Sequence, residues 1–146
     1  MATGEADVRV EVVGVFEQGP EEADQQDGAP VVVLRYSQNR ELHVSVSSCE
    51  GLAIHLALGQ HVVSRPLTHD LALRLLERLS TRLTRVVVDD ADGICCAKLL
   101  LSSAEGELWV EARPGDGIAL ALRAEVPIYA SEHLLARANR PGEGIS

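Results

Sequence analysis

The chain has 146 residues, of which 46% are hydrophobic and only 3% are aromatic, so we expect one domain with an aliphatic core. The net charge of −9 excludes a protein that attracts nucleic acid through its overall charge, although a local arginine cluster or bound metal ions could still hold phosphate. No apolar run approaches the roughly 20 residues of a membrane span, and the acidic N-terminus is unlike a signal peptide, which predicts a cytoplasmic protein without a membrane partner.

The N-terminal third predicts a strand, a loop and a hairpin. Alternating apolar and polar residues predict the strand over 8–16. Residues 17–29 are acidic and rich in glutamine, which indicates a solvated loop. A compact apolar run over 31–36, turn residues over 37–40 and a second alternating segment over 42–46 together predict a hairpin with one buried face.

Two helices are predicted next. The pattern S-x-x-E from Ser47 to Glu50 fits a capping box, and Gly59 is the expected C-cap of the same helix. Pro66 suits the first turn of a second helix. The apolar residues that mark this second helix recur at helical spacing and are Leu71, Leu75, Leu76, Leu79 and Leu83.

Three more strands are predicted in the second half of the chain. Apolar runs indicate strands over 86–88, 94–101 and 108–112. The acidic segment 89–93 ends in Asp-Gly and indicates the turn between the first two of them.

The C-terminal segment predicts two helices separated by a short strand. A helix opens at the Arg113-Pro114 pair and runs to about residue 124. The extended piece 126–129 contains Pro127, which predicts an edge position in the sheet. A last helix over 131–138 has Ser131 as its N-cap.

This order of elements predicts an α+β domain with a mixed, largely antiparallel sheet and helices packed on its faces. We expect the domain to span residues 8–138, with flexible ends over 1–7 and 139–146. Edge strands and an aliphatic-rich surface predict a homo-oligomer.

The three cysteines do not form a disulfide framework. Cys95 and Cys96 are adjacent in a predicted strand, so their side chains point to opposite faces, and Cys49 stands alone. Because no cysteine and histidine spacing is typical of zinc, we interpret all three as buried small hydrophobic side chains.

The first candidate site is Arg65-Pro66-Leu67-Thr68-His69-Asp70, at the start of the second helix. Thr68 is a candidate N-cap, and Asp70 complements the helix dipole there. His69 has three interpretations, which are a general base, a metal ligand or a surface residue.

Further carboxylates are candidates with structural alternatives. Glu50 is either the capping-box carboxylate or a catalytic group. Asp89, Asp90 and Asp92 could hold a metal ion for phosphodiester cleavage, or they could be ordinary turn residues.

The segment that opens at Arg113 combines an arginine and an acid at one turn. Arg113 could bind phosphate, and Asp116 could cap the helix or ligate a metal. Gly115 and Gly117 permit close approach of the backbone. The structural alternative is an ion pair between Arg113 and Asp116 that only fixes the turn.

The order of these features resembles the bifunctional nuclease family, a small bacterial and plant domain described as acting on both DNA and RNA. The resemblance covers the chain from about residue 8 to residue 138. Its matching parts are the strand over 31–34, Glu50, Arg65-Pro66-Leu67-Thr68-His69-Asp70-Leu71, Arg113-Pro114 with Asp116 leading into Ile118-Ala119-Leu120-Ala121, and Pro127-Ile128-Tyr129. Gly115-Asp116-Gly117 stands where the family usually has Ser-Asp-Ala, so Asp116 is the candidate helix cap here.

The resemblance implies a metal-assisted nuclease that hydrolyses DNA or RNA. The candidate catalytic residues are Glu50, His69, Asp70 and Asp116. Glu50, Asp70 and Asp116 are also the candidate ligands of Mg²⁺ or Mn²⁺, and Arg65 and Arg113 are the candidate phosphate-binding residues. Two alternatives stay open, a non-catalytic interaction or regulatory module with the same fold, and a protein that binds small anions at helix N-termini.

Overall fold

The computed structural model describes residues 7–17, 29–60 and 64–139. The strands are β1 (Asp7–Phe16), β2 (Val31–Ser37), β3 (Arg40–Ser45), β4 (Arg82–Ala91), β5 (Ile94–Ser103), β6 (Gly106–Ala112) and β7 (Ile128–Ser131). The helices are α2 (Ser48–Leu58), α3 (Thr68–Arg78), α4 (Pro114–Ala124) and α5 (Glu132–Ala138).

Within the described residues the strands form one sheet in the order β3-β2-β1-β7-β4-β5-β6. β4 and β7 pair in parallel, and the other described neighbours are antiparallel. This confirms the predicted α+β fold with a mixed, largely antiparallel sheet. The loop predicted over 17–29 lies mostly outside the described residues.

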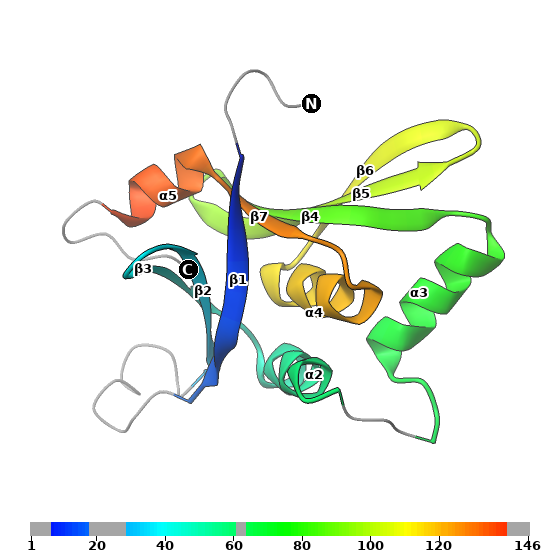
Figure 1. Ribbon diagram of the computed structural model, residues 1–146, viewed down its shortest axis with the longest axis horizontal. Coiled ribbons are helices and arrows are strands. Elements are labelled where there is room, and N and C mark those ends of the chain that lie inside the picture. Colours follow the sequence, from blue (N-terminus) through cyan, green and yellow to red (C-terminus); the bar gives the residue numbers. More distant parts are fainter. Residues whose placement is uncertain (1–6, 18–28, 61–63, 140–146) are drawn as a thin grey trace.

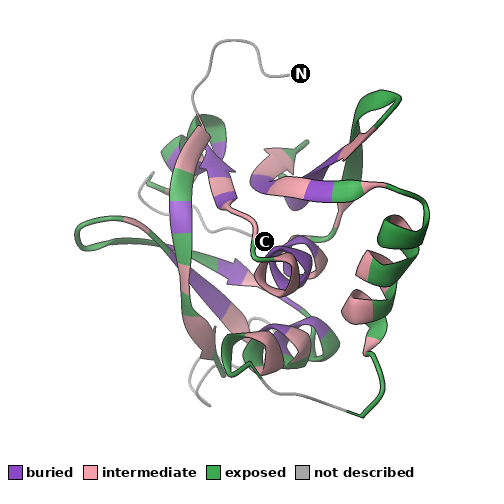
Figure 2. Ribbon diagram, turned by 45° about the vertical axis from the view of Figure 1, so that its right-hand side comes forward, coloured by how far each residue is buried: buried purple, intermediate pink, exposed green. Residues whose placement is uncertain are grey.

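Helix α4 is the centre of the core. It lies between α2 and the strands β4 and β5 (Figure 1). Its residues Ile118, Ala119 and Ala121 are fully buried, and the strand segments that face it are buried as well (Figure 2). A central apolar helix of small and branched residues is what an aliphatic core with few aromatic side chains requires.

Helix α3 is less covered than predicted. None of its residues, all of which the structure describes, is buried (Figure 2). Leu71, Leu75 and Leu79 are exposed although they recur at helical spacing. An exposed apolar stripe of this kind is consistent with self-association, but the predicted homo-oligomer stays a prediction.

The predicted bounds of this second helix are wrong at both ends. Pro66 precedes the helix, which begins at Thr68. Leu83 lies in β4, because the chain leaves the helix through a turn in which Ser80 has a positive φ of 55°. Leu83 continued the helical spacing by coincidence, since a buried strand residue and a buried helix residue have the same apolar character.

Strand β7 lies inside the sheet, so its predicted edge position is wrong. It pairs with β1 on one side and with β4 on the other. Pro127 precedes the strand, where its missing N–H breaks no ladder, and its carbonyl accepts a hydrogen bond of 3.1 Å from the backbone N–H of Val86. The proline therefore lies just before the strand and does not restrict β7 to an edge of the sheet.

The acidic segment 89–93, which follows the strand predicted over 86–88, is mostly strand itself. Asp89 and Asp90 belong to β4, and the turn is formed by Asp92 and Gly93, which both have positive φ. This is the two-residue Asp-Gly turn that suits a tight hairpin.

Asp89 and Asp90 have structural partners. The Asp89 carboxylate accepts hydrogen bonds from Ser131 Oγ at 2.6 Å and from Lys98 Nζ at 3.0 Å. The Asp90 side chain is 3% exposed and contacts His133 Nε2 and Arg137 Nη1, each at 2.9 Å. These contacts attach β5, β7 and α5 to β4, and they favour the structural alternative over the metal site for both residues.

The ionisation of Asp89 is expected to make the free energy of unfolding depend on pH. Burial opposes ionisation, but hydrogen bonds from Ser131, Lys98 and the backbone N–H of Asp90 hold the pKa of Asp89 below its ordinary value. A carboxylate with a lowered folded-state pKa stabilises the fold above its unfolded pKa, and this contribution is lost as the pH falls through the folded-state pKa.

We therefore expect the stability difference between the wild-type protein and Asp89→Asn to shrink as the pH is lowered below about 4. Urea unfolding at a series of pH values between neutral and acidic measures this difference. A difference that stays constant across the series would contradict the assignment.

Local predictions at the helix ends are confirmed. Gly59 is the C-cap of α2, and Ser131 caps α5 by accepting a hydrogen bond from the Leu134 N–H at 3.0 Å. Two residues of the predicted flexible ends belong to the fold instead. Asp7 is the first residue of β1. Asn139 is the C-cap of α5, and its side chain accepts a hydrogen bond of 3.1 Å from Tyr36 Oη.

Two further expectations concern compartment and cysteine burial. In the part of the chain that the structure describes, no helix is both long and apolar enough to span a membrane, and the cytoplasmic location stays a prediction. The three cysteines, all described, are free, and Cys95 and Cys96 are buried as expected. Cys49 is exposed, which corrects its expected burial; it lies in the first turn of α2, which faces a cavity.

Candidate active site

Glu50 is a buried carboxylate in the first turn of α2. Ser47 caps the helix, and its Oγ accepts a hydrogen bond of 3.2 Å from the Glu50 N–H, which is the serine half of the predicted capping box. The same hydroxyl donates to Glu50 Oε2 at 2.7 Å. Arg113 Nη1 lies 3.7 Å from Oε2, and the Glu50 side chain is 8% exposed. Glu50 is therefore held in place by a hydroxyl and a guanidinium group.

Two glycines let the start of α4 approach its neighbours closely. A Cβ atom at Gly115 would collide with Glu50 Oε1 and would lie 2.6 Å from Glu50 Cβ. A Cβ atom at Gly117 would lie 2.5 Å from Ala97 Cβ in β5. Only glycine fits at both positions without a shift of the neighbouring atoms. The start of α4 therefore packs closely against α2 on one side and against the sheet on the other.

Asp116, between these glycines, points to α3. Its Oδ1 lies 2.9 Å from His69 Nε2. The predicted cap by Asp116 is wrong, since α4 begins after Arg113 with Pro114 in its first turn and has no side-chain cap among the described residues. The contact with His69 takes the place of both a cap and the alternative Arg113–Asp116 ion pair.

Asp70 has a structural role at the start of α3. Its Oδ2 accepts a hydrogen bond of 3.1 Å from the Leu67 N–H, and its Oδ1 lies 3.5 Å from Arg123 Nε in α4. Leu67 occupies the N-cap position, so the predicted cap by Thr68 is wrong and Asp70 satisfies the free N–H instead. Both carboxylate oxygens are thus engaged within the fold.

A cavity of about 360 Å³ lies where α2, α3 and α4 begin. Its described lining comprises Ser47, Cys49, Glu50, Leu52, Ala53, Leu56, Leu67, Thr68, His69, Arg113 and Asp116. Four predicted site residues, Glu50, His69, Arg113 and Asp116, meet there although they come from three helix starts. Arg65 and Asp70 are not part of this lining; Arg65 is exposed on the segment before α3.

The groups around the cavity differ in their access to solvent. The Arg113 side chain is 77% exposed, whereas the His69 side chain is 15% exposed. An exposed guanidinium group can bind an incoming phosphate, and a nearly buried imidazole that contacts a carboxylate has a fixed orientation. The arrangement can therefore combine phosphate binding with proton transfer.

The residues present do not fit the predicted metal site. Among the described residues, no group of three or more histidine, cysteine, aspartate or glutamate side chains is arranged to hold a metal ion. The candidate ligands Glu50, Asp70 and Asp116 each contact protein donors instead. The predicted use of Mg²⁺ or Mn²⁺ stays a prediction, and we derive no step through a metal.

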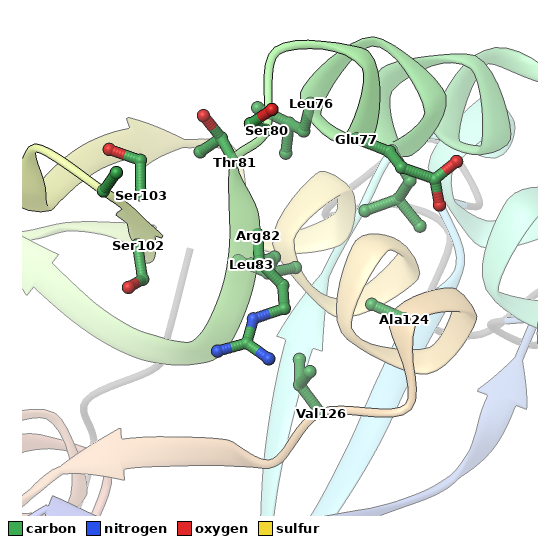
Figure 3. A pocket seen from close by; sticks show the side chains of 12 residues that line it. Leu76, Glu77, Ser80, Thr81, Arg82, Leu83, Ser102, Ser103, Ala124 and Val126 are labelled. Carbon is green, nitrogen blue, oxygen red and sulfur yellow. The ribbon is translucent and has the colours of Figure 1, made fainter.

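A larger cavity lies at the other end of α3. It measures about 680 Å³, and its lining includes Leu76, Glu77, Ser80, Arg82 and Val126 (Figure 3). Its described lining contains no histidine, and Glu77 is its one carboxylate. Size alone does not make it the reaction site, because catalysis needs groups that can exchange protons close to a phosphate-binding group. The smaller cavity has both.

Arg123 and Ser47 hold the site in ways that the sequence did not predict. Arg123 fixes Asp70 across the gap between α4 and α3, and the Ser47 hydroxyl donates to the carboxylate of Glu50 as well as capping the helix. The capping-box pattern was the signal for Ser47, whereas no local pattern pairs Arg123 with a residue so far along the chain.

Comparisons with known proteins relate this chain to two uncharacterized proteins and to one domain family. The chain is 37% identical over 131 residues to the uncharacterized proteins MT1877 and Rv1829 of Mycobacterium tuberculosis, which covers 88% of this chain and 74% of each relative. The bifunctional nuclease domain matches residues 32–143, a range that contains the four predicted site residues that line the smaller cavity. The chain therefore belongs to the bifunctional nuclease domain family.

Proposed function

We propose that this protein is a nuclease that cleaves phosphodiester bonds in the cavity at the starts of α2, α3 and α4. The contact of 2.9 Å between His69 Nε2 and Asp116 Oδ1, inside a cavity that also holds Arg113, carries this proposal. Membership of a nuclease domain family supports nucleic acid as the partner.

The His69–Asp116 pair supplies the acid–base chemistry. An ionised carboxylate only accepts hydrogen bonds, so Nε2 carries a hydrogen and donates it to Asp116, which leaves Nδ1 to accept a proton. Asp116 fixes the ring and stabilises the imidazolium that forms when His69 takes a proton. His69 is thus the proposed general base, and Asp116 is its positioning residue.

Arg113 binds the phosphate in this proposal, and Glu50 positions Arg113. The guanidinium group is largely exposed and lies 3.7 Å from the Glu50 carboxylate. Local binding of this kind is needed because the net charge of −9 repels a polyanion over the surface as a whole. A direct catalytic role for Glu50 stays a prediction.

The site favours a nuclease over the alternative of a small-anion-binding protein. The start of α4 would be the natural place for an anion. The Glu50 carboxylate already lies there, in contact with Gly115. A free anion would have to displace a buried side chain that has its own hydrogen bond from Ser47.

Replacing Arg113 by alanine tests the phosphate-binding role. We expect the KM for a nucleic acid substrate to rise about tenfold or more, because a charge-assisted hydrogen bond contributes about 1.5–3 kcal/mol. Arg40→Ala is the matched control, since Arg40 is also exposed but lies at the start of β3, at the edge of the sheet. Equal KM values for the two variants would contradict the role, and a wild-type protein without any cleavage would favour the non-catalytic module.

A further inference from the structure

We infer that the exposed face of α3 is a second binding surface, which holds the phosphate backbone of a nucleic acid strand outside the cavity and leads the strand into it. This inference rests on the proposed function for what happens to the strand, but the surface contains none of the proposed catalytic residues. It applies to DNA and RNA alike, because both carry the same phosphate backbone.

Four exposed arginines follow α3 from one end to the other. Arg74 and Arg78 lie on the helix, Arg65 lies just before it and Arg82 lies just after it. None of these four residues, which we call the α3 arginine row, forms an ion pair with another residue that the structure describes. Since the chain as a whole has a net charge of −9, a polyanion needs such a local gathering of positive charge.

The carboxylates near the α3 arginine row do not neutralise it. The segment 65–82 contains two of them, Asp70 and Glu77. Asp70 contacts Arg123 of α4 at 3.5 Å and not a member of the row. Glu77 lies near the end of α3 and forms no ion pair with a described arginine. The row therefore keeps an excess of positive charge.

The spacing of the arginines suits a strand. Arg74 and Arg78 are four residues apart, so they share one face of the helix with a rise of about 6 Å between them. This rise is comparable to the distance between neighbouring phosphates of an extended strand. Leu71 and Leu75 are exposed and each lies three residues before one of these arginines, which makes them neighbours on the helix surface. The face therefore offers charge for phosphates beside apolar surface for sugars and bases.

Helix α3 connects the two cavities. His69, in its first turn, lines the smaller cavity. Arg82 lines the larger cavity at the other end, together with the hydroxyl groups of Ser80 and Thr81 (Figure 3). The helix between them has 11 residues and is about 16 Å long. A strand with one phosphate at Arg113 can therefore continue along the row, with further phosphates at its arginines.

A second copy of the chain is the other occupant that the exposed leucines of α3 would suit. Packing α3 against the α3 of a second copy would bring Arg74 and Arg78 of both chains close together, and repulsion between like charges opposes this. Phosphate groups carry the opposite charge. Charge complementarity therefore favours a nucleic acid strand as the occupant.

The test compares two pairs of substitutions in the full chain. Arg74→Gln/Arg78→Gln removes two charges from the row, whereas Arg9→Gln/Arg40→Gln removes two exposed charges from β1 and β3. The two variants have the same net charge. Binding of a labelled single strand long enough to span α3, as DNA and as RNA, is measured by fluorescence anisotropy over a series of salt concentrations. For binding alone, every protein also carries His69→Ala, and kcat and KM are then measured with His69 intact.

We expect Arg74→Gln/Arg78→Gln to raise Kd about 10–30-fold for both strands at about 0.1 M salt. Each lost phosphate contact should lower the slope of log K against log salt concentration by about 0.7, so the pair lowers it by about 1.4. The control pair should raise Kd less than about threefold. With His69 intact, KM should rise with Kd, while kcat stays within about twofold of the wild type.

Equal Kd values for the two pairs, an unchanged salt slope, or a fall in kcat without a rise in KM would overturn the inference and leave the nuclease proposal standing. A second copy on this face would overturn it as well, and would be seen in sedimentation as a dimer that Leu75→Ser converts to a monomer without raising Kd. A wild-type protein that never cleaves, but whose binding is lost in Arg74→Gln/Arg78→Gln, would support the surface and contradict the nuclease.

Discussion

Replacing His69 by alanine is expected to lower kcat for nucleic acid cleavage by about 10²–10⁴-fold, which is the usual contribution of a general base. The KM should change little, because phosphate binding is assigned to Arg113. The fold should persist, because the His69 side chain lies in the first turn of α3, where no residue is buried, and is itself 15% exposed. Steady-state kinetics, together with thermal unfolding of the same samples, measure both effects.

The chain contains a close control for this substitution. His133 also lies 2.9 Å from an aspartate, Asp90, but the pair belongs to α5 and β4 and does not line the cavity. His133→Ala should therefore keep kcat within about twofold of the wild type. Similar losses in His69→Ala and His133→Ala would show that the His69 effect is structural.

Replacing Gly115 by alanine is expected to disable the site through packing. The new methyl group would collide with the Glu50 carboxylate, which has a buried position and a hydrogen bond from Ser47. Overpacking of this kind typically costs about 1–3 kcal/mol of unfolding free energy. Alanine would otherwise stabilise a helix relative to glycine, so a net loss of stability can be assigned to the collision.

The double variant Gly115→Ala/Glu50→Ala separates packing from chemistry. Alanine at position 50 removes the colliding carboxylate but keeps Cβ, which would lie 2.6 Å from the new methyl group, so only part of the lost stability should return. Activity should stay low, because Arg113 has lost the carboxylate that positions it. Denaturant unfolding and kinetics of the wild type and the three variants test this. Additive losses of stability in the double variant would contradict the close packing of Glu50 on Gly115.

The parts of the fold that depend on neighbours in sequence were predictable. A compact apolar run, turn residues and an alternating segment located the hairpin of β2 and β3, and the capping patterns located the starts of α2 and α5. These features arise from groups a few residues apart, whose geometry is set by the backbone alone.

The parts that depend on distant contacts were not predictable in the same way. Asp70 and Asp116 look alike as acids in the first turn of a helix, yet Asp70 pairs with Arg123 while Asp116 pairs with His69, 47 residues away. The position of β7 was missed for the same reason, since its parallel pairing with β4 depends on the path of the whole chain. Pro127 indicates only that one backbone N–H is missing, and it does not indicate which strands lie beside β7.

The sequence predicted which charged residues meet at one cavity better than it predicted the contacts that each of them makes. The resemblance and the charged motifs selected six residues, and the structure brings Glu50, His69, Arg113 and Asp116 to one cavity. Asp70 belongs to the fold through Leu67 and Arg123. That difference follows from the direction of each side chain, which is decided by how α3 and α4 pack.

A double-mutant cycle on His69 and Asp116 is the most direct test of the claim that these two residues form the reaction centre. We expect Asp116→Asn to lower kcat/KM for nucleic acid cleavage by about 10–100-fold, as loss of an orienting partner usually does. If Asp116 acts only through His69, the double variant His69→Ala/Asp116→Asn should be no slower than His69→Ala alone. Losses that add in the double variant, or an Asp116→Asn protein with full activity, would contradict the claim.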